Sequence, residues 1–285
     1  MNISNKCLIN NKDDLISYGA TAYVYKKGDI AIKQLFYMNL EKGLREISTM
    51  ETIKQQQNYY DLNKFKKTKT LGELKILPYG DFFHCEENKY FLIEMALFDG
   101  TLQDIFFDLK IDEIKKMYHD ILHTLYLLRE LGIYHDDISL TNIFYKKIND
   151  EYIFALGDFG RMSVEPRYSF YNFIKNIKKE LIIANILNTM TFEQIMEFIE
   201  ESNKSLWLSI KKNYEKEVEY FTTKIPHRPL ELIEPAIKKQ IIQGVIRGMK
   251  KEKLKELINY KILFSKSKEI MKFFKNIDYK LIGNL

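Results

Sequence analysis

The chain has 285 residues, of which 46% are hydrophobic and 29% are charged, so it can bury a large core in one large unit or two smaller ones. Two cysteines, Cys7 and Cys85, predict neither a disulfide framework nor a metal site, and no apolar run reaches membrane-spanning length. With a polar amino-terminal stretch unlike a signal peptide, the sequence predicts a soluble cytoplasmic monomer, in a host cytoplasm if the chain is viral or an effector.

The net charge of +5 is distributed unevenly along the chain. Residues 203–285 contain 19 Lys and Arg against 9 Asp and Glu. A basic region of this kind can meet nucleic acid, an acidic partner or a membrane surface. No zinc-finger spacing and no RNA-binding aromatic motif accompanies it, so solvated lysine faces on helices are the preferred interpretation and no nucleic-acid partner is expected.

Two strands are predicted near the amino terminus, over 15–25 and 30–35, with a turn at 26–29. The first strand carries small residues that allow a backbone to approach a ligand closely: Ser17, Gly19, Ala20 and Ala22. Taken alone, this pattern is explained better by a plain hairpin. Lys33 lies near the end of the second strand, where a lone lysine is normally a surface cation with a buried stem.

A helix is predicted over 40–53, because apolar residues recur there at steps of three and four. Three acids of this helix are candidates to face Lys33, namely Glu41, Glu46 and Glu51, and we choose the central Glu46. Residues 55–69 are polar and lysine-rich, which predicts a loop. Two further strands follow, over 74–84 and 89–96.

The clearest predicted helix covers 111–131 and ends at Gly132, a plausible C-cap. Directly after it comes the polar stretch 134–143, in which Asp137 and Asn142 are five residues apart. A hairpin with its turn at Asn149-Asp150 then leads to Asp158, sixteen residues after Asn142. Two carboxylates and a carboxamide on adjacent loops suit phosphoryl transfer, in which one acid orients the attacking hydroxyl while the others hold Mg²⁺.

The motif His135-x-Asp137-x-x-x-x-Asn142, followed by Asp158-Phe159-Gly160, resembles the catalytic and metal loops of the eukaryotic-type protein kinase superfamily. The resemblance covers about residues 13–160. It implies an α+β, bilobal fold with a small, mostly β lobe over 1–97 and a larger helical lobe over 98–285. ATP and Mg²⁺ are then the expected ligands, bound between the lobes.

The resemblance also implies roles for single residues. Asp137 would accept the substrate hydroxyl proton, Lys33 would bind phosphate while held by Glu46, and Asn142 and Asp158 would bind the metal. His135 would hold the loop without being the base. The remaining implied nucleotide contacts are Ser17, Gly19, Ala20, Ala22, Val24, Ala31, Glu94 and Ala96, with main-chain groups around 94–96 facing the adenine.

Several positions depart from the family pattern. Ser17 and Ala22 stand where the family usually has glycines, and Ser139 replaces a lysine that contacts the transferring phosphate. Asp136 replaces an arginine that pairs with a phosphorylated activation loop, so that mode of regulation is not expected.

Beyond Gly160 the resemblance is limited to helix content, with amphipathic helices predicted over 171–200 and 230–276. The activation segment is therefore either very short, which we prefer, or interrupted, with residues 222–232 as its distant end.

Three functions follow as alternatives. The preferred one is transfer of the γ-phosphate of ATP to Ser or Thr hydroxyls of a protein substrate. The second is a phosphotransferase of kinase fold that acts on a small molecule, because the substrate-docking segment and the lysine at Ser139 are missing. The third is a catalytically weak scaffold, because the glycine loop is eroded.

Overall fold

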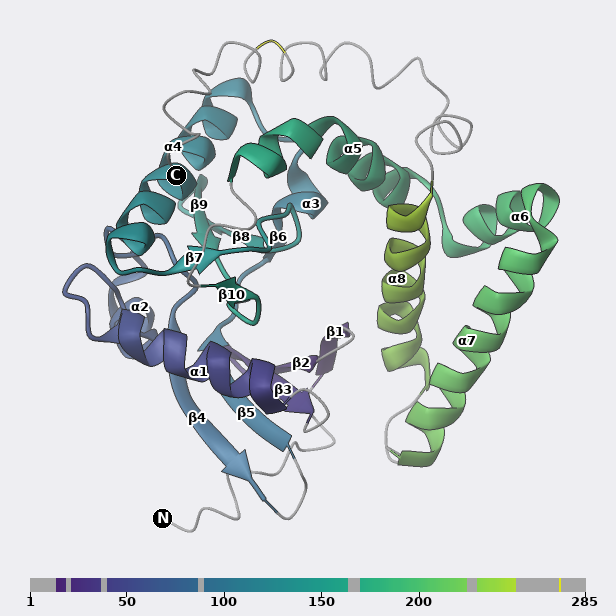
Figure 1. Cartoon of the computed structure of the whole chain (residues 1–285), viewed down its shortest axis with the longest axis horizontal. Coiled ribbons are helices and arrows are strands. Elements are labelled where there is room, and N and C mark those ends of the chain that lie inside the picture. The colour runs from purple at the N-terminus through teal and green to yellow at the C-terminus, as the bar shows by residue number, and fades with distance from the viewer. Residues whose placement is uncertain are drawn as a thin grey trace.

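The computed structural model describes residues 14–18, 22–36, 40–86, 90–163, 170–224, 230–249 and 272. Within these residues the fold is mixed α+β (Figure 1). The described helices carry no segment that is both long and apolar enough to cross a membrane.

An antiparallel five-stranded sheet forms the amino-terminal part, in the order β1-β2-β3-β5-β4. Its strands are β1 (Asp14–Tyr18), β2 (Ala22–Lys27), β3 (Ile30–Phe36), β4 (Tyr79–Cys85) and β5 (Tyr90–Ala96). β2 and β3 join through a tight turn in which Gly28 has a φ of 62°, a conformation that glycine adopts without steric cost. Cys85, at the end of β4, is buried and disulfide-bonded, contrary to the expectation of unpaired cysteines.

Helix α1 (Leu40–Lys54) is confirmed, and it packs on the sheet through Ile47, Met50 and Ile53. The spacing of three places these side chains on one face, and burial of each contributes about 1.5–3 kcal/mol. The predicted loop over 55–69 is wrong in part, because α2 (Leu62–Thr68) lies within it. The Asp61 side chain caps this helix by accepting a hydrogen bond from the Lys64 backbone N–H at 2.7 Å.

The middle of the chain is built around α4 (Ile111–Glu130), which begins and ends within one residue of the prediction. The positive φ of Gly132, 70°, agrees with the predicted C-cap. The short elements of this part of the chain are β6 (Gly100–Thr101), α3 (Leu102–Ile105), β7 (Tyr134–His135) and β10 (Met162–Ser163), of which β7 contacts α4. The same hydrophobic core runs from the sheet and α1 to the buried face of α4.

The predicted hairpin after the polar loop is confirmed as β8 (Ile143–Ile148) and β9 (Glu151–Leu156). Asn149 and Asp150 form its turn with φ values of 50° and 64°. Two consecutive positive φ angles are typical of the type I′ turn, whose twist matches that of an antiparallel pair. The hairpin ends two residues before Asp158 and so fixes where that side chain lies.

The carboxy-terminal helices form a second core around isoleucines. They are α5 (Phe170–Thr189), α6 (Phe192–Ser202), α7 (Lys204–Lys224) and α8 (Leu230–Gly248). Ile233, Ile237 and Ile241 recur at steps of four along α8 and are buried. This core also includes Leu15 of β1 and Tyr23 of β2, so α8 packs beside the edge of the sheet, with α6 and α7 on its outer side (Figure 1).

Three further expectations differ from the structure. The predicted strand over 15–25 is two strands, and the predicted helix over 171–200 is two helices separated at Thr191, which caps α6. Strand β4 begins at Tyr79 rather than at residue 74. The predicted helix over 230–276 is confirmed to Gly248, and residues from 250 onward lie outside the described residues except for 272.

Candidate active site

A cleft of about 1040 Å³ lies where the sheet, the loop after β7, the segment after β9 and α8 meet. It is lined on one side by Val24, Ala31 and Lys33 of the sheet and on another by Asp137 and Asn142. Most of the polar residues that the sequence indicates for phosphoryl transfer therefore share a single cavity.

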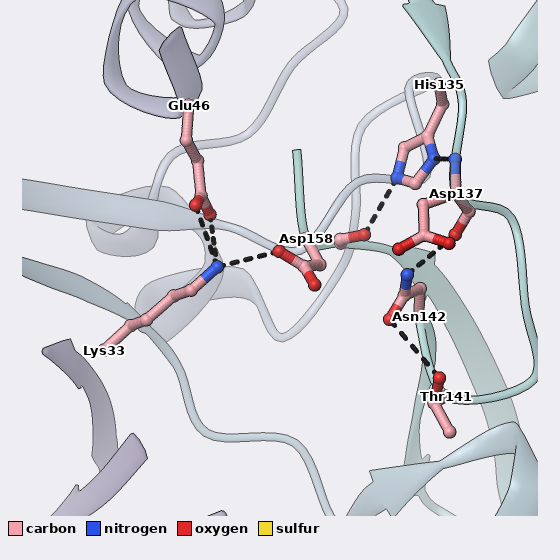
Figure 2. Close-up of polar contacts among 8 residues, drawn as sticks. Lys33, Glu46, His135, Asp137, Thr141, Asn142 and Asp158 are labelled. Carbon is pink, nitrogen blue, oxygen red and sulfur yellow. Dashed lines mark hydrogen bonds and ion pairs between the residues drawn. The ribbon is translucent and has the colours of Figure 1, made fainter. Parts of the chain in front are cut away.

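Lys33 is the centre of a three-residue ion-pair cluster (Figure 2). Its Nζ donates to both carboxylate oxygens of Glu46 at 2.8 Å and to Oδ1 of Asp158 at 2.8 Å. Lys33 comes from β3, Glu46 from α1 and Asp158 from the loop after β9, so three separate segments converge here. The structure thus pairs Lys33 with Glu46 rather than with either of the other two candidate acids.

Burial and charge oppose each other in this cluster. Lys33 is 8% exposed and Glu46 is 1% exposed. Burial lowers the pKa of Lys33, but the Asp158 and Glu46 carboxylates outweigh it, so this pKa lies above its ordinary value. Burial raises the pKa of Glu46 against the effect of Lys33, whereas Lys33 lowers the pKa of Asp158. Lys33 is therefore charged and held in place, and Asp158 is ionised at neutral pH.

His135 is a buried, neutral anchor of the polar loop. Its Nδ1 accepts a hydrogen bond from the Asp137 backbone N–H at 3.3 Å, so Nε2 carries the proton and donates to the Gly157 carbonyl at 3.0 Å. Burial lowers the pKa of His135, which favours this neutral form. The ring also contacts Phe159 edge-on, with centroids 5.0 Å apart. His135 thus joins the Asp137 loop to the Asp158 segment.

Asn142 has its amide orientation fixed by the same loop. Its Nδ2 donates to the Asp137 carbonyl at 2.7 Å, and its backbone carbonyl accepts from the Gly157 N–H at 2.9 Å. Because Nδ2 is engaged, Oδ1 is the amide atom left for a cation, although it also accepts a long contact of 3.5 Å from Thr141 Oγ1 (Figure 2).

The Asp137 carboxylate lines the cleft, with 37% of its side chain exposed. Arg161, which directly follows Asp158-Phe159-Gly160, places Nη1 3.6 Å from Asp137 Oδ1. The Asp136 backbone N–H donates to the Arg161 carbonyl at 3.1 Å, which holds the two segments together. The acid that the sequence indicates as the proton acceptor is thus open to the cleft and has a cation beside it.

Part of the cleft wall is apolar. Val24 and Ala31, both expected nucleotide contacts, line it together with Leu77, Met95 and Phe144. A flat aromatic base needs such surfaces on both faces.

One expected nucleotide contact is not free. The backbone N–H of Ala96 donates to the Pro78 carbonyl at 2.8 Å, so it is already used within the protein. Glu94 does not line the cleft, and its carbonyl belongs to strand β5, which pairs with β3. The Ala96 N–H is therefore not available to donate a hydrogen bond to the adenine, as the expectation for main-chain groups at 94–96 would require.

The structure brings most of the predicted site residues into one place. Those that line the cleft are Ser17, Ala22, Val24, Ala31, Lys33, Ala96, Asp137, Asn142 and Asp158. Glu46 lies behind Lys33, and Gly19 and Ala20 fall outside the described residues. Sequence reasoning missed Phe144, Arg161 and the α8 side chains, although Arg161 stands next to the recognised Asp158-Phe159-Gly160.

Asp158 and Asn142 fit a magnesium ion. A magnesium ion bound with a nucleotide usually takes one or two protein oxygens and completes its shell with phosphates and water. The ionised Asp158 and the oriented Asn142 Oδ1 supply two such oxygens. Among the described residues no three His, Cys, Asp or Glu side chains gather as a metal site, so the protein offers no all-protein cage.

No known protein family and no curated protein matches this chain.

Proposed function

We propose that this chain is an ATP-dependent phosphotransferase similar to protein kinases, with Ser or Thr hydroxyls of a protein as its acceptors. The observation that carries the proposal is that Lys33 and Asp158 line the same cleft as Asp137 and Asn142, with Glu46 buried behind Lys33 and paired to it. A lone buried lysine or a lone acidic loop has simple structural explanations. Four such groups from three segments line one cavity, and Glu46 from a fourth segment holds Lys33; together they match the needs of phosphoryl transfer.

The proposal extends to the fold. In it, the five-stranded sheet with α1 is the smaller lobe, over about 1–97, and the helical remainder over 98–285 is the larger one. The nucleotide base would contact the apolar side chains of Val24, Ala31 and Phe144, and Lys33 would bind the phosphates; all four residues line the cleft.

The reaction is a displacement at the γ-phosphorus. The acceptor oxygen forms a bond to that phosphorus, the bond to the β,γ-bridging oxygen breaks, and ADP leaves with the electron pair. Asp137 orients the acceptor hydroxyl and takes up its proton. Lys33 binds phosphate oxygens, and Glu46 keeps its ammonium group in position. Asp158 and Asn142 would hold Mg²⁺, which neutralises phosphate charge when bound.

A small-molecule acceptor is the second candidate, and one observation favours it. The face of α8 that carries Lys239, Gln240, Gln243 and Arg247 lines the same cleft as Asp137. Contacts with β1 and α5 hold this helix in place. A wall of polar side chains beside the acceptor acid offers hydrogen-bond partners to a compact hydroxylated molecule.

The experiment is transfer of labelled γ-phosphate from Mg-ATP to three acceptors: the protein itself, general polypeptides and a panel of hydroxylated metabolites. Asp137→Asn runs beside the wild type, and circular dichroism checks that it is folded. Label on Ser or Thr that disappears in the variant supports the protein-kinase proposal, and label on a metabolite supports the second candidate. Nucleotide binding without any transfer refutes both and favours the scaffold.

A further inference from the structure

Helix α8 carries an arginine to the polar loop between Asp137 and Asn142. Arg247 Nη2 donates to Thr141 Oγ1 at 3.1 Å, and that hydroxyl lies 2.8 Å from Ser139 Oγ. Arg247 also lines the cleft. A cation from the last described helix thus reaches the loop that holds the proposed proton acceptor, a location that nothing in the sequence motif indicates.

The fold fixes the position of Arg247. The isoleucine face of α8 is buried in the second core, and Lys179 of α5 donates to the Arg247 carbonyl at 3.1 Å. Lys239, two turns earlier on the same helix, donates to Asp104 Oδ1 at 3.1 Å. Because the backbone of Arg247 and its helix are held in place, its side chain loses less conformational entropy when it binds a ligand.

Transfer of a phosphoryl group concentrates negative charge on three equatorial oxygens, and a positive group aimed at them lowers the barrier. Lys33 is shared between two carboxylates at 2.8 Å, and Arg161 faces the Asp137 carboxylate. Within the described residues no carboxylate lies at ion-pair distance from Arg247, whose side chain donates to a neutral hydroxyl. Glu180 also lines the cleft; burial raises the pKa of this acid, and the charge of Arg247 opposes that effect. Its remaining N–H groups are suited to phosphate oxygens, which guanidinium binds in a bidentate manner.

We propose that Arg247 is a further catalytic residue of the proposed phosphotransferase and binds the phosphate group that is transferred. The carboxy-terminal helices then do more than pack, because α8 completes the active site. The inference rests on the proposed function, since it needs ATP in this cleft.

The test compares Mg-ATP with Mg-ADP, which lacks the group that Arg247 would touch. Isothermal titration measures both dissociation constants for the wild type, Arg247→Gln and Arg247→Lys. We expect Arg247→Gln to weaken ATP binding by about 10-fold or more, the usual effect of a lost hydrogen bond to a charged group. ADP binding stays unchanged, and Arg247→Lys recovers part of the loss.

Two control variants separate catalysis from structure. Lys238→Gln removes one charge from α8 at a side chain that pairs with Glu193 and Glu234, and it keeps the wild-type ratio of ATP to ADP affinity. Thr141→Val removes the hydroxyl that Arg247 contacts. If the guanidinium binds the γ-phosphate, this variant also keeps the wild-type ratio of ATP to ADP affinity. Where transfer is measurable, Arg247→Gln lowers kcat by about 10²–10³-fold.

The outcomes are distinguishable. If the wild type binds both nucleotides and Arg247→Gln binds them with an unchanged ratio, the role of Arg247 is refuted while the proposed function stands. A ratio that changes equally in Thr141→Val and Arg247→Gln shows that Arg247 only positions the loop, and this also overturns the proposal. A folded wild type that binds neither nucleotide overturns both proposals.

Discussion

The ion pair between Lys33 and Glu46 allows a quantitative prediction, because both side chains are almost fully buried. Lys33→Met leaves the Glu46 carboxylate buried without its cation. Removal of one partner of a buried pair costs about 3–5 kcal/mol. We expect about 3 kcal/mol, the lower end, because Glu46 can escape part of the cost by taking up a proton.

The proton uptake gives the prediction a sign in pH. Burial already raises the pKa of Glu46, and loss of Lys33 removes the group that opposes this. An acid whose pKa is higher in the folded state than in the unfolded state stabilises the fold at low pH. This contribution is lost as the pH rises from the unfolded-state pKa through the folded-state pKa. The deficit of Lys33→Met therefore grows from acidic toward neutral pH.

The assay is urea unfolding followed by circular dichroism at several pH values, with Lys33→Met/Glu46→Leu as the matched control. Replacement of both charges by apolar groups is often neutral. The double variant therefore recovers most of the stability and loses the pH dependence that comes from Glu46, while Asp158, which also loses its cation, titrates alike in both variants. The reasoning is refuted if the single variant is as stable as the wild type near neutral pH, or if the double variant is no better than the single one.

Two further predictions concern the scaffold of the site. Burial lowers the pKa of His135, so the stabilising contribution of this neutral histidine is complete above about pH 6.5 and decreases as the pH falls below that value. We expect urea unfolding at a series of pH values to show this decrease in the wild type and in the exposed-site control His123→Gln. The same decrease is absent in His135→Gln. Gly244→Ala stabilises α8 by about 1 kcal/mol, since an added Cβ meets nothing within 4 Å. In contrast, Gly157→Ala lowers the thermal midpoint, because its Cβ falls 2.6 Å from Phe144 Cε2; equal midpoints for the two variants contradict this packing.

Local sequence patterns predicted much of the fold around the site. The steps of three and four in 111–131 gave α4, and Asn149-Asp150 gave the β8–β9 turn, because both are local features. The pairing of Lys33 with Glu46 was also predicted, from the central position of Glu46 in its helix and from the resemblance to protein kinases.

What the sequence did not predict depends on contacts between distant segments. Helix α2 was missed because its lysines resemble a loop, while its two buried residues, Leu62 and Phe65, are fixed by tertiary packing. The role of α8 was missed because Arg247 lies 106 residues from Thr141, and no periodicity indicates which polar face of a helix meets a cleft. Main-chain groups around 94–96 were expected to face the adenine, but the hydrogen bond from the Ala96 N–H to the Pro78 carbonyl could not be read from the strand pattern.

The measurement that tests the account most directly is titration of ATP into the wild type and Asp158→Asn, with and without Mg²⁺. The surface variant Asp112→Asn, whose exposed carboxylate pairs with Lys115, is the control. The account predicts that Mg²⁺ strengthens ATP binding to the wild type and to the control, and that this gain disappears in Asp158→Asn. Folded wild-type protein that does not bind ATP, or an undiminished gain in Asp158→Asn, would contradict it.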